Sequence, residues 1–192
     1  MIPVYPNIRC LIFDCDGTLA DTMSLHWEAW QEAFIAIGKR CPENFLDDLK
    51  GTPAEEIIER LNESYGYDLD IKQFAKEKQK RVQRKLFRAK PIQPVVEIAK
   101  RYRNRFPMAV VSGGTKANVQ LILEAIGLAD FFDPIITADD PVKPKPSPDI
   151  FLEAARRLNM EPQYCQVFED SDLGIEGARK AGMSVTDVRL FI

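Results

Sequence analysis

The chain has 192 residues, of which 45% are hydrophobic and 29% are charged. This composition is typical of a globular protein with one core domain, or with a core domain that carries a smaller insertion. The 26 Lys and Arg against 29 Asp and Glu give a net charge of −3, which argues against nucleic acid or an anionic membrane as a partner.

The N-terminus and the cysteines indicate the compartment. The first ten residues, MIPVYPNIRC, contain no basic segment followed by an apolar one, and no uncharged apolar stretch approaches the thickness of a bilayer. Cys10, Cys15, Cys41 and Cys165 are widely spaced, and the single histidine, His26, cannot complete a zinc site with them. Isolated cysteines of this kind fit a reducing compartment. We therefore expect a cytoplasmic protein with no membrane partner.

Short apolar runs predict the strands of a sheet. They are rich in branched or aromatic residues and lack the polar alternation of a half-exposed strand, as expected for a parallel sheet covered on both faces. A further run, SVTDV, predicts an edge strand at 184–188. The four main runs are CLIF at 10–13, MAVV at 108–111, PIIT at 134–137 and CQVF at 165–168.

Helical periodicity separates the last three of these runs. Apolar residues recur at helical spacing over 119–126, before Gly127, and again over 151–158; a third helical pattern follows the last run and ends at Gly182. Strands that alternate with helices indicate the α/β class. We predict a core with a Rossmann-like parallel sheet.

Between the first two runs, residues 22–90 show helical periodicity and no convincing strand. Nearly seventy residues exceed what one crossover helix needs, so this segment is interpreted as an inserted all-helical cap subdomain. The predicted core domain then comprises residues 1–21 and 91–192.

Polar side chains follow the predicted strands at their carboxyl ends, where open parallel sheets bind their ligands. The loop KPKPSPD adds a lysine to the same edge of the sheet. Together these positions supply carboxylates, a hydroxyl, a flexible amide and an ammonium group. They are Asp14 and Asp16 after the first strand, Ser112 and Gly113 after the second, Lys145 in the loop, and Glu169 and Asp170 after the last long strand.

This set of groups suits phosphate chemistry assisted by a metal. Hard oxygen ligands without His or Cys select a hard divalent cation, and Mg²⁺ takes one or two carboxylates together with a substrate phosphate. Asp14 and Asp170 fit that role, with Glu169 as a further ligand or as a residue that orients its neighbour. The Ser112 hydroxyl and the Lys145 ammonium are natural donors to phosphate oxygens.

The segments DCDGTLADT, VVSGG, KPSPDIF and FEDSDLGIEGARKAGM resemble, in order, the four motifs of the haloacid dehalogenase-like hydrolase superfamily. The resemblance covers essentially the whole chain. Within the superfamily, the chain is most similar to the β-phosphoglucomutase-like branch with a helical cap, and in particular to short bacterial phosphatases that act on sugar phosphates such as fructose 1-phosphate.

The resemblance implies a role for each motif residue. Asp14 would be the nucleophile that becomes aspartyl-phosphate, and Asp16 the general acid and base. Ser112 and Lys145 would hold the phosphate. The metal, Mg²⁺, would be bound by Asp14, by the backbone carbonyl of Asp16, and by the acidic pair Glu169 and Asp170. Because Asp16 must carry a proton when the alkoxide leaves, its pKa should lie above that of a free aspartate.

The cap should select the substrate. The loop LKGTP, which contains Lys50 and Gly51, corresponds to the family's loop that enters the site, and His26 falls where relatives place a histidine near the acid and base. β-Phosphoglucomutases carry a phosphate-binding arginine in this loop, whereas the matching residue here is Ala54. This departure favours hydrolysis over mutase activity.

We therefore expect a monomeric Mg²⁺-dependent phosphomonoesterase that acts on a small phosphorylated sugar. The alternatives are a β-phosphoglucomutase and a ligand-binding protein without turnover. His26 could equally cover an apolar helix face. Residues 72–90 hold nine Lys or Arg and one acid, which indicates a solvated helix, a guide for anionic substrates or a nucleic-acid patch.

Overall fold

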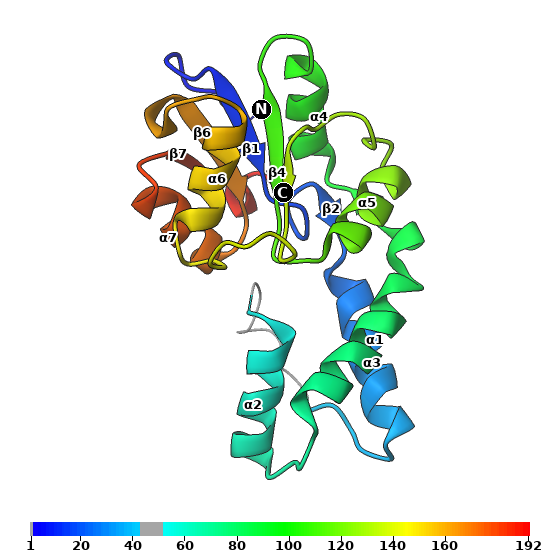
Figure 1. The fold of residues 1–192 in the computed structure, drawn as a ribbon. Helices are drawn as coiled ribbons and strands as arrows, with labels where there is room; N and C mark the ends of the chain where they lie inside the picture. The colour runs from blue at the N-terminus through cyan, green and yellow to red at the C-terminus, as the bar shows by residue number, and fades with distance from the viewer. Residues whose placement is uncertain (1, 43–51) are drawn as a thin grey trace.

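The computed structural model describes residues 2–42 and 52–192, and its centre is a parallel sheet in the order β5-β4-β1-β6-β7 (Figure 1). The predicted α/β fold with a Rossmann-like parallel sheet is confirmed. The strands are β1 (Cys10–Phe13), β4 (Met108–Val111), β5 (Ile135–Ile136), β6 (Cys165–Glu169) and β7 (Ser184–Asp187).

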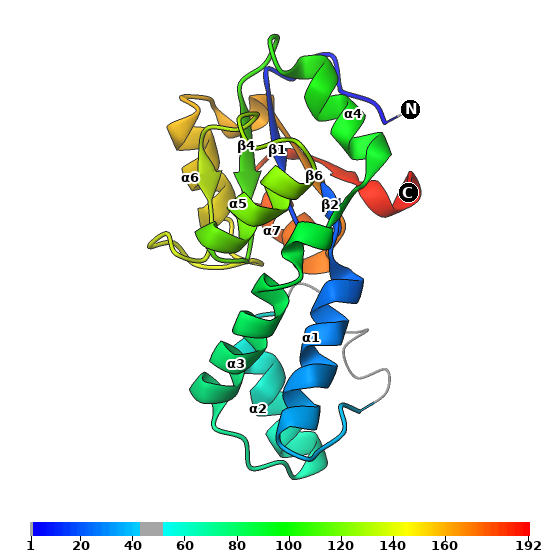
Figure 2. The same cartoon turned by 90° about the vertical axis from the view of Figure 1, so that its right-hand side faces the viewer.

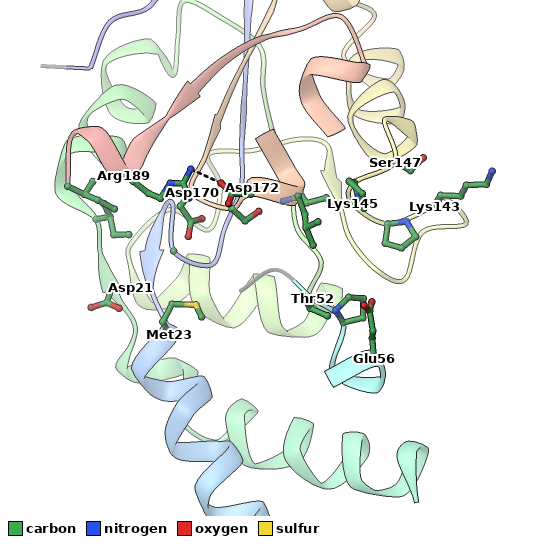
Figure 3. Close-up of a pocket in the computed structure, with 18 of the residues that line it drawn as sticks. Asp21, Met23, Thr52, Glu56, Lys143, Lys145, Ser147, Asp170, Asp172 and Arg189 are labelled. Carbon is green, nitrogen blue, oxygen red and sulfur yellow. Dashed lines mark ion pairs between the residues drawn. The ribbon is translucent and has the colours of Figure 1, made fainter. Parts of the chain in front are cut away.

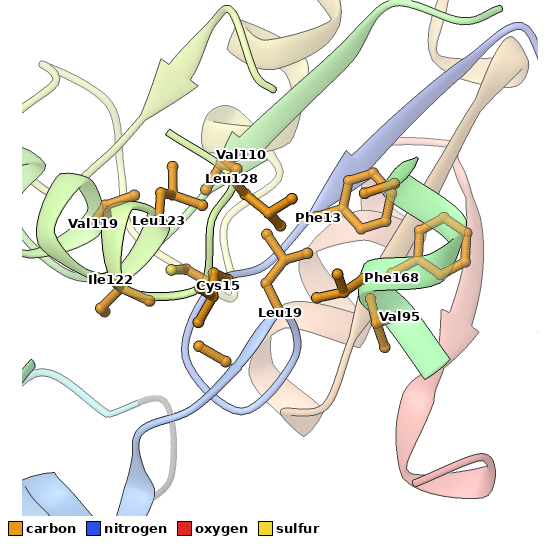
Figure 4. Close-up of a cluster of buried hydrophobic side chains, with 14 of the residues drawn as sticks. Phe13, Cys15, Leu19, Val95, Val110, Val119, Ile122, Leu123, Leu128 and Phe168 are labelled. Carbon is orange, nitrogen blue, oxygen red and sulfur yellow. The ribbon is translucent and has the colours of Figure 1, made fainter. Parts of the chain in front are cut away.

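Helices cover both faces of the sheet, which explains why β1 is apolar at every position. Successive residues of a strand point to opposite faces. Leu11 and Phe13 pack in a hydrophobic cluster with α4 and α5 (Figure 4), and Cys10 and Ile12 pack in a second cluster with α6 and α7. All four side chains are fully buried. The helices are α4 (Gln93–Tyr102), α5 (Lys116–Ala125), α6 (Asp149–Arg157) and α7 (Asp172–Lys180).

Three helices between the first two long strands lie together beyond the sheet (Figures 1 and 2). They share a hydrophobic cluster centred on Phe34, Ile58 and Phe74, which gives them a core of their own. This cluster supports the cap interpretation, and the boundaries at residues 21/22 and 90/91 stay a prediction. The helices are α1 (Met23–Ala36), α2 (Ala54–Tyr65) and α3 (Ile71–Gln83).

A short antiparallel ribbon connects these helices to the core. β2 (Ala20–Asp21) pairs with β3 (Lys90–Pro91), so the chain leaves the core and returns to it at adjacent points. The remaining elements are single turns of 3₁₀ helix: η2 (Leu86–Arg88), η3 (Pro162–Tyr164) and η4 (Val188–Leu190). Within the described residues, no helix combines the length and apolar character needed to cross a membrane.

Candidate active site

A cavity of about 660 Å³ lies at the carboxyl ends of the strands, next to helices α1, α2 and α3. Eight of the predicted site residues line it, although they come from distant parts of the chain. Lys50 and Gly51 lie outside the described residues. The lining residues are Asp14, Asp16, His26, Ser112, Gly113, Lys145, Glu169 and Asp170.

Asp14, Lys145 and Glu169 form the buried centre of the site. The Lys145 Nζ atom donates to Asp14 Oδ1 at 2.6 Å and to Glu169 Oε2 at 2.7 Å, and all three side chains are nearly inaccessible to solvent. Burial alone would lower the pKa of Lys145, but the charges of Asp14 and Glu169 raise it above its ordinary value. Lys145 is therefore a fixed cation beside the predicted nucleophile.

One ammonium group does not balance the carboxylates gathered here. Oxygen atoms of Asp14, Glu169 and Asp170 lie within 4.8 Å of one another. Burial and the charge of Glu169 raise the pKa of Asp14 well above its ordinary value, and the same two causes raise the pKa of Asp170 to about 6. Both shifts mark a shortage of positive charge. An all-oxygen donor set with excess negative charge fits Mg²⁺.

Glu169 differs from the other two carboxylates because its oxygens already have partners. Its Oε1 atom accepts hydrogen bonds from Ser171 Oγ at 2.8 Å, Ser171 N at 3.0 Å and Asp170 N at 3.2 Å, while Oε2 faces Lys145. A Cβ at Gly174 would lie 2.1 Å from this carboxylate, so only glycine leaves room for it. These contacts favour the interpretation that Glu169 orients its neighbours, and they favour Asp14 and Asp170 as the metal ligands.

A tight turn after β1 brings Asp170 to the same place. Gly17 has a φ of +86°, a conformation that strongly favours glycine, and a Cβ there would lie 2.3 Å from Asp170 Oδ2. The next residue, Thr18, donates its hydroxyl to Asp170 Oδ1 at 2.9 Å. The turn between Asp14 and the cap therefore also holds the predicted metal ligand from β6.

Asp16 has a different environment from Asp14. Thr22 Oγ1 donates to Asp16 Oδ1 at 2.6 Å, and His26 Nε2 lies 3.4 Å from the same oxygen. Burial alone would raise the pKa of Asp16, but His26, Thr22 and the positive charge of Lys78 together lower it. The expectation of a raised pKa is wrong for this structure, because α1 and its N-cap supply two donors to the carboxylate and α3 adds the positive charge of Lys78.

Lys78 is a site residue that the sequence interpretation missed. Its Nζ lies 2.9 Å from His26 Nδ1, and its side chain is buried against the Trp30 ring, 5.3 Å from the ring centre. An ammonium group can only donate, so His26 accepts at Nδ1 and carries its proton on Nε2, toward Asp16. The sequence did carry a sign that Lys78 is buried. Lys78 lies at helical spacing between Phe74 and Val82, on the apolar face of α3.

Ser112 and Gly113 follow β4 on the opposite side of Asp16. Ser112 Oγ lies 3.5 Å from Asp16 Oδ2 and accepts a hydrogen bond from Gly114 N at 3.0 Å. The Ser112 side chain is buried, whereas Gly113 is exposed at the cavity wall. This loop therefore offers a hydroxyl and backbone amides next to Asp16, in the cavity that Asp14 also lines.

A second, larger cavity of about 1320 Å³ forms the mouth of the site (Figure 3). Lys145 and Asp170 line both cavities, so the mouth leads to the reactive groups. Its outer walls are α2, the loop at 143–147 and the start of α7. The cleft thus lies between the core and the cap helices.

Four of the nine basic residues of 72–90 form ion pairs with acidic residues of α1 and α3. Lys85 contacts Glu32 at 2.7 Å and Glu28 at 3.2 Å, and Arg88 contacts Glu28 at 2.8 Å. Further along α3, Glu77 pairs with a lysine and an arginine. These ion pairs favour the solvated helix over the nucleic-acid patch.

The haloacid dehalogenase-like hydrolase family model matches residues 11–188, and the chain belongs to this family. The fructose-1-phosphate phosphatase YqaB of Escherichia coli (strain K12) is 38% identical over 187 residues, which cover 97% of this chain and all of that protein. The resemblance stated from the motifs is confirmed.

Solved structures agree with this assignment. A crystal structure of CbbY from Rhodobacter sphaeroides in complex with phosphate is 28% identical, with a TM-score of 0.82 over 93% of this chain and 84% of that chain. A β-phosphoglucomutase from Clostridium difficile is 27% identical, with a TM-score of 0.81 over 93% and 83% of the two chains. The chain is thus similar both to a phosphatase and to a mutase.

Proposed function

We propose that the protein is a Mg²⁺-dependent phosphomonoesterase that hydrolyses a small sugar phosphate through an aspartyl-phosphate on Asp14. The observation that carries the proposal is the contrast between two aspartates in one cavity. Asp14 is buried against the Lys145 ammonium, and Asp16 is held as a carboxylate by Thr22 and His26. Two carboxyl groups with different environments can take the roles of nucleophile and proton carrier.

In the first step, an Asp14 oxygen attacks phosphorus and the bond from phosphorus to the sugar oxygen breaks. Asp16 gives a proton to the departing oxygen, and Lys145 offsets the charge on the phosphoryl oxygens. The unliganded site holds Asp16 ionised, so its pKa must rise when substrate binds. The negative charge of an arriving phosphate has that effect on a nearby carboxyl group.

In the second step, water attacks phosphorus and the bond to Asp14 breaks. Asp16, now ionised, takes the proton from this water and is again protonated, as it was when substrate was bound; it loses that proton to solvent once phosphate leaves. His26 points its Nε2 proton at Asp16 and is held in that tautomer by Lys78. We assign these two residues to the orientation of Asp16.

Mg²⁺ would be held by Asp14, Asp170 and the backbone carbonyl of Asp16, and it would neutralise phosphate oxygens and stabilise charge in the transition state. Ser112 and the backbone amides of its loop would bind the remaining phosphate oxygens. Glu169 would keep Lys145 in place.

Hydrolysis is preferred over phosphoryl transfer to a second sugar hydroxyl. Ala54, which lines the cavity at the start of α2, has no charge with which to hold a second phosphate. The similarity to a fructose-1-phosphate phosphatase over the whole chain supports the same choice. We propose residues 22–90 as the cap that covers the sugar, and we keep the monomer as a prediction.

The test is a phosphate-release assay with Mg²⁺ and a panel of hexose and pentose phosphates that includes fructose 1-phosphate and β-glucose 1-phosphate. We expect free phosphate from wild type and none from Asp14→Asn. Asp68→Asn, at an exposed position between α2 and α3, is the matched control and should match wild type. Formation of glucose 6-phosphate without phosphate release would identify a mutase, and an active Asp14→Asn variant would remove Asp14 as the nucleophile.

A further inference from the structure

Asn118 is a buried polar residue of the cavity to which the mechanism gives no role. It lies in the first turn of α5, its exposed fraction is 4%, and it lines the same cavity as Asp14, Asp16 and Ser112. Across the described ranges 2–42 and 52–192, its Oδ1 is the one buried side-chain nitrogen or oxygen atom without a hydrogen-bond partner.

An unpaired polar atom of this kind is costly in the free protein. Native structures pair nearly all of their buried polar atoms, since an unpaired acceptor loses its bonds to water and gains nothing in return. The helix cap does not need this side chain, because the Asn118 backbone N–H is already bonded to Thr115 Oγ1 at 3.4 Å. The amide of Asn118 therefore fits a partner that arrives in the cavity.

The surroundings indicate the chemistry of that partner. Here the cap approaches the core, with Gln79 Nε2 of α3 at 3.5 Å from Thr115 Oγ1. Two tryptophans of α1, Trp27 and Trp30, line the same cavity. A neutral amide acceptor in a cavity that aromatic and amide side chains of α1 and α3 also line suits a hydroxyl donor, whereas a phosphate dianion would need donors or a cation.

We propose that a half-turn of the Asn118 side-chain amide brings Oδ1, which is sealed from solvent in the free protein, to the cavity, where it accepts a hydrogen bond from a hydroxyl of the phosphorylated sugar. Asn118 is then a specificity residue. This inference rests on the proposed phosphatase function and deepens it. The site then favours a phosphate ester that carries a hydroxyl at this place, because an ester without that hydroxyl leaves the Asn118 acceptor unpaired in the complex as it is in the free protein. Sites that hydrogen-bond a substrate hydroxyl discriminate against analogues that lack it for this reason.

The test compares fructose 1-phosphate with phenyl phosphate, an ester that carries no hydroxyl. For Asn118→Leu, which keeps the branched shape without the polar atoms, we expect the ratio of kcat/KM for fructose 1-phosphate to that for phenyl phosphate to fall about tenfold. The midpoint of thermal unfolding should stay the same or rise, because an unpaired buried acceptor is replaced by an apolar group.

Asn62→Leu is the matched control. The Asn62 amide is fully engaged with the Leu69 backbone in both directions, at 3.0 Å each. This variant should lower the unfolding midpoint and leave the ratio of the two kcat/KM values as in wild type. A merely structural role for Asn118 predicts the same pattern for Asn118→Leu, and that result would overturn the proposal.

A second measurement changes the substrate in place of the side chain and then checks the result with one variant. Wild type is tested with a series of monodeoxy fructose 1-phosphates, and one missing hydroxyl should lower kcat/KM about tenfold more than the others do. Asn118→Ala should be insensitive to that same deletion. If every deoxy analogue reacts alike, the inference fails while the phosphatase function stands. If wild type releases phosphate from no ester, the proposed function fails, and this inference fails with it.

Discussion

Lys78 should stabilise the active geometry at a cost to the stability of the fold, and Lys78→Met tests this. Only 6% of the lysine is exposed, and burial lowers its pKa from 10.5 to about 8, even though the charge of Asp16 opposes the shift. Methionine has a similar length, carries no charge and suits the contact with Trp30. We expect the variant to be more stable than wild type and less active.

The magnitude follows from the pKa shift of Lys78. A shift of one pKa unit corresponds to about 1.4 kcal/mol, so the lowered pKa corresponds to a penalty of about 3 kcal/mol for the buried ammonium. The variant also loses the hydrogen bond from Lys78 to His26, worth about 1 kcal/mol. The expected net gain in the free energy of unfolding at pH 7 is therefore about 2 kcal/mol.

The gain in the free energy of unfolding of Lys78→Met over wild type should depend on pH within a defined range. Below pH 8, Lys78 is protonated in both the folded and the unfolded state, so the penalty is fully present. Between pH 8 and 10.5 the unfolded chain binds more protons than the folded one, so wild-type stability rises with pH relative to the variant. Near pH 10.5 and above, the penalty has gone.

Urea unfolding of wild type and Lys78→Met at pH 7, 8.5 and 10 measures this difference. Lys80→Met is the control, because Lys80 is on the same helix but is exposed and paired with Glu77. Its effect should be small and independent of pH over this range. Destabilisation by Lys78→Met at pH 7, or a gain that does not shrink as pH rises, would refute the assignment of a strained, buried ammonium group.

Three further predictions concern the carboxylates. Gly174→Ala should lower the free energy of unfolding by about 3 kcal/mol and remove most of the activity, because the alanine Cβ would displace the Glu169 carboxylate. Chemical unfolding measures the first effect and phosphate release the second. Thr22→Val removes a hydrogen bond to ionised Asp16 and so raises the pKa of Asp16. The alkaline limb of the kcat/KM profile, on which Asp16 loses the proton that the first step needs, should move to higher pH, and an unmoved limb would contradict the contact. Millimolar Mg²⁺ should raise the thermal unfolding midpoint of wild type but not of Asp170→Asn, and an equal rise in both would remove Asp170 as a ligand.

The sequence predicted the sheet well because buried parallel strands leave a strong local signal. The runs at 10–13 and 108–111 match β1 and β4 residue for residue. The two-residue strands β2 and β3 are too short to show any periodicity, and they were not predicted. Helix α4 was also missed, because the sequence at its start was interpreted only as the boundary between residues 22–90 and the core.

The site was predicted as far as chemistry follows the ends of strands. Asp14, Ser112 and Asp170 were expected at one edge of the sheet, and they line one cavity. Lys78 was not expected, because its role depends on α3 crossing α1 and placing the lysine against His26. A contact between residues 52 positions apart leaves no local pattern beyond a lysine on an apolar helix face.

The same long-range contact explains why the direction of the Asp16 pKa shift could not be derived from DCD alone. Asp14 and Asp16 both line the cavity, and Cys15 between them is buried in the core. The local sequence around the two aspartates is nearly symmetrical, so only their different contact partners can give them different pKa values. Asp14 receives one cation that it shares with Glu169, whereas Asp16 receives the donors of the cap helices. The pKa of Asp16, the proton carrier of the proposed mechanism, is therefore set by α1 and α3. A movement of these helices that weakens the His26 contact would raise this pKa toward what proton donation requires.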